Sequence, residues 1–186
     1  MTVVVFICCW LAFFYSIFGD PFRARQLLLL PNCVNIEYLF TAPYNLLSPI
    51  FFHTTWLHIL FNSILWWQLA GSIETYISKR VLVILLVASS SIPNLTQFLV
   101  IGPNFAGISG VIYALVGYIW WINLLDNKAE IYLPKAVIVG ALIWLAMGFI
   151  DMLPVMSGNA GHLAGLICGC LIALIDVKTS LVSGKK

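Results

Sequence analysis

Six apolar segments, each bounded by charged or turn-forming residues, constrain the fold of this chain more than any other feature of its sequence. A helix needs about 20 mainly apolar residues to cross a bilayer, with tolerance for shorter or tilted segments. We therefore predict membrane spans at residues 3–18, 55–76, 81–100, 109–125, 135–150 and 159–177. Charged residues make up only 9% of the chain, against about 25% in soluble domains. The sequence predicts an all-α membrane protein, a single transmembrane domain over residues 1–186 with no soluble domain.

A long segment, residues 19–54, separates the first two predicted spans. It contains FRARQLLLL, several prolines and several aromatic residues. Arginines mixed with leucines are typical of short helices that lie in the headgroup region of a membrane. We predict a six-helix bundle with a long interfacial first loop.

The lysines and arginines predict the orientation, because short cytoplasmic loops carry an excess of them. Two, Arg23 and Arg25, fall on one side of the predicted bundle. The other side receives Lys79, Arg80, Lys128, Lys135, Lys178, Lys185 and Lys186. We predict an integral multi-pass membrane protein with both termini in the cytoplasm. The second, fourth and sixth spans then enter from the outer face, and their first turns share one depth.

Composition also argues against several kinds of partner. The net charge is only +2, and the basic residues form no continuous face, so nucleic acid is not an expected partner. The cysteines at positions 8, 9, 33, 168 and 170 form no CxxC pair and no ligand spacing with histidine. We interpret them as small apolar residues and expect no cofactor.

Polar residues at the outer ends of three predicted spans form a candidate site. Ionisable groups inside a membrane are costly and suggest function, and His58 and His162 both fall within spans. Ser109 begins the fourth span, and Asn62 shares a helix face with His58. A serine beside an imidazole is the minimum pair of nucleophile and general base. His58 and Asn62 could donate hydrogen bonds to the oxyanion of a tetrahedral intermediate.

A second interpretation of Ser109 is simple helix packing, since membrane helices approach each other through small residues spaced by four. Two such rows are Ala106, Gly110 and Ala114, and Gly161, Gly165 and Gly169. Taken alone, Ser109 fits this interpretation better. The two interpretations are compatible, because these rows would bring a serine helix and a histidine helix close together.

Other chemistries fit the sequence less well. Ser109 does not lie in a GxSxG motif, no lysine is expected at its depth, and no acidic residue lies mid-span near His162. Metal binding by His58 and His162 would need a third ligand, and neither His53 nor Asp151 is well placed. We predict no metal site.

Three blocks of the sequence resemble the motif blocks of the rhomboid intramembrane serine proteases, of the six-span bacterial type. They are HTTWLHILFN at residues 53–62, GISGVIYALVGY at 107–118 and GHLAGLICG at 161–169. The resemblance implies that Ser109 is the nucleophile and His162 the general base of a two-residue dyad. It assigns the oxyanion site to His58, Asn62 and the main chain around Gly107 and Ser109. Tyr113 would pack against the base, and His53 would support the structure.

The resemblance further implies cleavage of transmembrane protein substrates near the outer face of a bacterial inner membrane. Residues 151–158 would cap the site, and the fifth span would be a lateral gate. The chain departs from the family pattern in having Tyr44-Asn45 in place of a Trp-Arg pair, Gly161 in place of alanine, and no cytosolic N-terminal domain.

Two alternative functions remain open at this point. A non-catalytic rhomboid-like protein would bind transmembrane helices without cutting them, but such proteins typically lack the dyad. A small transporter would show inverted repeats or mid-membrane charges, and the sequence shows neither.

Overall fold

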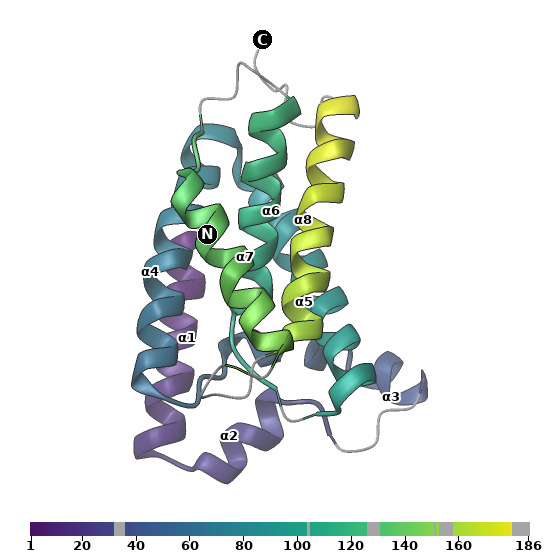
Figure 1. Cartoon of the computed structure of the whole chain (residues 1–186). Helices are drawn as coiled ribbons and strands as arrows, with labels where there is room; N and C mark the ends of the chain where they lie inside the picture. Colours follow the sequence, from purple (N-terminus) through teal and green to yellow (C-terminus); the bar gives the residue numbers. More distant parts are fainter. Residues whose placement is uncertain (32–35, 104, 126–130, 151, 153–157, 180–186) are drawn as a thin grey trace.

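The computed structural model describes residues 1–31, 36–103, 105–125, 131–150, 152 and 158–179. Every regular element in these ranges is a helix, and they contain no strand (Figure 1). The all-α fold class is therefore confirmed. Some of the predictions above concern residues outside the described ranges, namely Cys33, Lys128, Asp151, residues 153–157 of the expected cap, Lys185 and Lys186.

A long helix occupies each of the six segments that were predicted to span the membrane. These helices are α1 Thr2–Phe18, α4 Trp56–Ser72, α5 Lys79–Ile101, α6 Ser109–Leu125, α7 Lys135–Phe149 and α8 Asn159–Thr179. In the part of the chain that the structure describes, α5 and α8 have both the length and the apolar composition to cross a membrane. Helices α1, α6 and α7 are apolar but shorter, at 17, 17 and 15 residues. The arrangement as six spans stays a prediction.

The second of these segments was predicted as one span, over residues 55–76, but it is not one regular helix. The α-helix α4 ends at Ser72, and the π-helical turn η3 Ile73–Ile77 follows it. This turn carries Glu74, whose carboxylate accepts hydrogen bonds from the N–H and the hydroxyl of Thr2, at 2.8 and 2.7 Å. The wider turn therefore ties the end of α4 to the start of α1.

Short helices make up much of the first loop. They are α2 Pro21–Leu28, α3 Ile36–Thr41, η1 Pro43–Leu46 and η2 Ser48–Phe51. Asp20 begins α2 by accepting the N–H of Arg23 at 2.9 Å, as an N-cap residue does. The Asn94 side chain of α5 donates to the Leu46 carbonyl at 2.8 Å and holds the loop against the bundle. The position of these short helices in the headgroup region stays a prediction.

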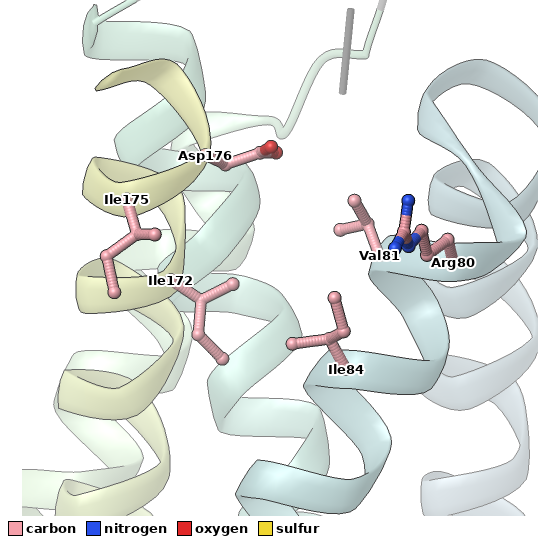
Figure 2. Close-up of a pocket in the computed structure, with 6 residues that line it drawn as sticks. All are labelled: Arg80, Val81, Ile84, Ile172, Ile175 and Asp176. Atoms are coloured by element: carbon pink, nitrogen blue, oxygen red, sulfur yellow. The ribbon is translucent and has the colours of Figure 1, made fainter. Parts of the chain in front are cut away.

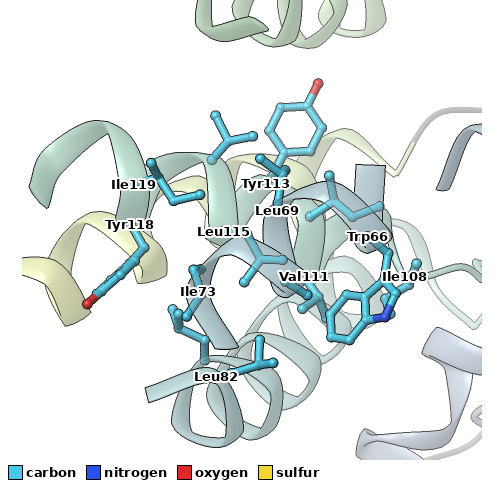
Figure 3. Close-up of a cluster of buried hydrophobic side chains, with 14 of the residues drawn as sticks. Trp66, Leu69, Ile73, Leu82, Ile108, Val111, Tyr113, Leu115, Tyr118 and Ile119 are labelled. Carbon is cyan, nitrogen blue, oxygen red and sulfur yellow. The ribbon is translucent and has the colours of Figure 1, made fainter. Parts of the chain in front are cut away.

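Helix α6 lies at the centre of the bundle. Every residue from 111 to 119 is buried, as expected for a helix that is apolar all round. Figure 3 shows Val111, Leu115 and Ile119 of α6 among side chains of the neighbouring helices. Those neighbours are Trp66 and Leu69 of α4, Ile73 of η3 and Leu82 of α5.

Helices α6 and α8 meet along a seam where the main chains touch. A Cβ atom placed on Gly165 would lie 3.0 Å from the carbonyl carbon of Gly110, and closer still to its oxygen. A Cβ atom on Gly169 would lie 2.7 Å from the carbonyl carbon of Ala114. Neither position has room for a side chain. The expectation that rows of small residues bring these two helices together is confirmed at these four residues.

One member of the predicted rows was assigned wrongly. Ala106 precedes α6 and packs against a small cluster formed by Ala24, Leu29 and Phe52 of the first-loop region. Gly117 extends the seam in its place, because a Cβ atom there would collide with the Leu166 carbonyl of α8. The spacing of four was correct, but α6 begins at Ser109, so Ala106 lies outside the helix and the seam lies further along α6.

Candidate active site

The seam brings Ser109 and His162 into direct contact. Ser109 is the first residue of α6, and His162 lies in the first turn of α8. The serine Oγ is 2.7 Å from Nε2 of the imidazole, which is the distance of a good O–H···N hydrogen bond. The His162 side chain is buried, at 7% exposure, whereas Ser109 remains partly accessible. A hydroxyl that donates to an unprotonated Nε2 has the geometry of a nucleophile beside its base.

Tyr113 lies against the face of the His162 ring. The two ring centroids are 4.7 Å apart and the planes are inclined by 23°, so the rings stack. The tyrosine hydroxyl donates to the Ala141 carbonyl of α7 at 2.9 Å. This position matches the supporting role that the resemblance assigned to Tyr113. The stacking restricts how the imidazole can turn away from Ser109.

His58 and Asn62 converge on Gly107. A Cβ atom at Gly107 would lie 2.5 Å from Nε2 of His58 and 3.4 Å from Nδ2 of Asn62. The backbone φ of Gly107 is +103°, a conformation that residues with side chains rarely adopt. Glycine is therefore needed at this position for two reasons: its backbone conformation, and the room that it leaves for His58 Nε2 and Asn62 Nδ2.

The polar hydrogens around Gly107 are not all available to an oxyanion. The Gly107 N–H donates to the Pro49 carbonyl at 3.0 Å, so it is already engaged. Nδ2 of Asn62 is buried and has no hydrogen-bond partner among the described residues. A buried amide donor without a partner is unusual and calls for an explanation, because leaving it unpaired costs free energy. Asn62 is thus the strongest candidate for an oxyanion donor.

His53 lies directly behind His58. The two rings meet edge to face, with centroids 4.9 Å apart, and Nδ1 of His53 is 3.2 Å from the Phe51 carbonyl. Burial lowers the pKa of His53 to about 3, and the neighbouring His58 contributes to the shift. His53 is therefore neutral near pH 7 and packs against His58 without adding a charge to the site.

The sequence analysis missed one residue that holds the site together. Gln97 of α5 is 3% exposed, and its side-chain oxygen accepts the N–H of Gly161 at 2.9 Å. That N–H belongs to the first turn of α8, where the helix itself offers no acceptor. Gln97 therefore fixes the first turn of α8, immediately before His162. A buried glutamine inside a predicted span was the signal that could have identified it.

The described residues contain no group of three histidine, cysteine, aspartate or glutamate side chains that could hold a metal ion. What they bring together is a hydroxyl, an imidazole that can accept its proton, and a buried amide donor, Asn62 Nδ2, without a partner among these residues. Acyl transfer needs these three components. Of the cap predicted over residues 151–158, only Met152 and Gly158 lie within the described ranges.

Comparison with known proteins identifies relatives of this chain. The family model described as the Rhomboid domain matches residues 41–179. Proteins named Rhomboid protease GlpG from Salmonella choleraesuis (strain SC-B67), Salmonella newport (strain SL254) and Salmonella typhi are each 39% identical to it over 127 residues. The aligned region covers 68% of this chain and 46% of each relative. The chain thus spans about half the length of the curated relatives that it matches.

Proposed function

This chain belongs to the rhomboid family, and on that premise we propose that it is a serine endopeptidase that cleaves transmembrane proteins within the membrane. The contact of 2.7 Å between Ser109 Oγ and His162 Nε2 carries the proposal. The alternative of a non-catalytic protein that binds transmembrane helices gives no reason for this pair of groups to be kept in contact.

In the proposed reaction, Nε2 of His162 takes the hydroxyl proton as Ser109 Oγ attacks the carbonyl carbon of the scissile bond. The tetrahedral intermediate places its negative charge near Asn62 Nδ2 and His58 Nε2, which donate hydrogen bonds to it. His162 then gives the proton to the leaving amine, and an acyl group remains on Ser109. Water, deprotonated by the same imidazole, then attacks the acyl carbon; its bond to Ser109 Oγ breaks, the acid product leaves, and His162 returns the proton to the serine.

The substrate requirement follows from the chemistry of helices. A carbonyl that already accepts an intrahelical hydrogen bond is shielded from attack, so the substrate must unwind at the cleavage site. Ser109 and His162 lie in the first turns of α6 and α8, at one end of the bundle, where water and an unwound segment can reach them. We propose that this end faces the outer side of a bacterial inner membrane, with the basic ends of the helices in the cytoplasm.

Labelling with a fluorophosphonate tests this proposal directly. The full chain, reconstituted in liposomes, is expected to react covalently with the probe at Ser109, to be identified by peptide mass spectrometry. It is also expected to cut a model transmembrane substrate. The Ser109→Ala variant should do neither. A different result would support the binding function instead: a folded wild-type protein that does not react with the probe, cuts no model substrate, and still binds the transmembrane helices of these substrates.

Removal of the Asn62 amide is expected to lower kcat by about 10²-fold to 10³-fold, because one oxyanion donor is worth that much. Asn62→Ala should change KM and the unfolding midpoint little, since its Nδ2 has no partner in the folded protein. Steady-state cleavage of a model transmembrane substrate measures both constants.

Asn94→Ala is the matched control for Asn62→Ala. Asn94 is also a buried amide, but its Nδ2 already donates to the Leu46 carbonyl. Its loss should reduce the free energy of unfolding by about 1 to 3 kcal/mol and leave kcat nearly unchanged. An equal fall in kcat for the two variants would count against a place for Asn62 in the oxyanion site.

A further inference from the structure

A hollow lies between α5 and α8, at the end of the bundle where α5 begins and α8 ends. Its volume is about 80 Å³. It is far from Ser109 and His162, which belong to the opposite end of α6 and α8. The residues that line it are Arg80, Val81, Ile84, Ile172, Ile175 and Asp176 (Figure 2).

The walls of this hollow are aliphatic and open to the surface of the bundle. Figure 2 shows the side chains of Ile84 and Ile172 directed toward each other across it. Ile84 is 38% exposed and Ile175 is 52% exposed, so the hollow faces the surroundings of the protein. In a membrane protein such a surface meets lipid chains, and a recess in it has room for part of one.

Arg80 is the basic residue that lines the hollow, and further basic residues lie nearby in the sequence of both helices. Arg80 is exposed, lies one turn before Ile84 on the same face of α5, and follows the exposed Lys79. Lys178 is exposed and lies one turn after Ile175 on the same face of α8. Toward this end of the bundle, both helices therefore present the same order of groups, first aliphatic and then basic.

The start of α5 adds a further attraction for a phosphate. The Ser78 side chain accepts the N–H of Val81 at 3.1 Å, while the N–H groups of Lys79 and Arg80 have no acceptor within the helix. Together with the helix dipole, such N–H groups favour an anion. The Asp176 carboxylate also lines the hollow; it is 2% exposed and accepts the Tyr118 hydroxyl.

We propose that this hollow binds one anionic glycerophospholipid of the cytoplasmic leaflet. The phosphate lies at Arg80 and the start of α5, and the first part of an acyl chain fills the recess between Ile84 and Ile172. The aliphatic walls distinguish a lipid from free phosphate, and the three basic side chains favour an anionic headgroup over a zwitterionic one. The proposal does not depend on the proteolytic activity.

Native mass spectrometry of the full chain, delipidated in detergent and mixed with dioleoylphosphatidylglycerol, tests the proposal. One lipid is expected to bind more tightly than the rest. Arg80→Gln should weaken this first binding by about tenfold, the effect of losing one charge-assisted contact. Ile84→Trp, which fills the recess and keeps the charge, should weaken it as well. Arg23→Gln, an exposed arginine at the other end of the bundle, should leave it unchanged.

Three results would overturn the lipid site. Equal losses in Arg80→Gln and Arg23→Gln would mean that charge acts diffusely over the whole surface. Displacement of the lipid by an equal concentration of glycerol 3-phosphate would mean that the headgroup alone is recognised. Equal binding of dioleoylphosphatidylcholine would mean that the basic groups select nothing. Because Arg80 is exposed, its replacement by glutamine is expected to leave the fold intact.

Discussion

Ser109→Ala, His162→Ala and the double variant are expected to cleave a model transmembrane substrate at one common residual rate, about 10⁴-fold or more below that of the wild type. The reason is that the two side chains perform one act. Without the imidazole the hydroxyl keeps its proton, and without the hydroxyl the imidazole has nothing to activate. Residues that act as a unit lose their effect together, so the two losses should not add. Single-turnover cleavage in liposomes measures the three rates.

The thermal unfolding of the same three proteins in detergent is the control. Ser109 and His162 share a hydrogen bond of 2.7 Å, but α6 and α8 are held by their seam, so the midpoints should move little. A His162→Ala variant within tenfold of the wild-type rate would show that another group accepts the proton. A double variant far slower than either single variant would show that the two residues act independently.

Gly169→Ala is expected to lower the free energy of unfolding by about 3 kcal/mol, the upper part of the usual range for overpacking. The added methyl group would lie 2.7 Å from the carbonyl carbon and 2.9 Å from Cα of Ala114. These are main-chain atoms of a buried helix and cannot turn aside as the end of a side chain can. Relief requires that α6 and α8 separate along the seam. Equilibrium unfolding in mixed micelles measures the loss.

Gly140→Ala is the matched control, because a Cβ atom at Gly140 of α7 has no neighbour within 4 Å. The same substitution there should raise the free energy of unfolding by up to about 1 kcal/mol, the difference in helix propensity between glycine and alanine. If Gly169→Ala were as stable as Gly140→Ala, the two main chains could not be in close contact at Gly169.

The sequence predicted the helices well because a membrane leaves the chain little choice. Backbone groups in lipid must be satisfied within the segment, so an apolar stretch between charges becomes a helix. The end of such a helix is harder to predict. The apolar pattern continues from α4 into η3, and one extra residue per turn leaves no mark in composition. The hydrogen bonds of Glu74 that accompany this turn reach Thr2 of α1, far away in sequence.

Of the site, the contact between Ser109 and His162 followed from the rows of small residues and from the shared depth of the helix starts. Gln97 and the engaged N–H of Gly107 did not follow. Each depends on one hydrogen bond to a distant segment, Gln97 with Gly161 and Gly107 with Pro49. The periodicity of the sequence does not predict such a pair, because the same residues could equally form hydrogen bonds with other donors or acceptors.

The seam between α6 and α8 makes the spacing of the reactive pair robust to mutation. The two helices are spaced by main-chain atoms at Gly165 and Gly169, so the distance between them does not depend on the size of most other side chains. Leu163, Ile167 and Leu171 of α8 are 39%, 50% and 52% exposed and lie on its outer face. Substitutions at these three positions alter the outer surface of α8, while the separation of Ser109 and His162 is kept by the seam.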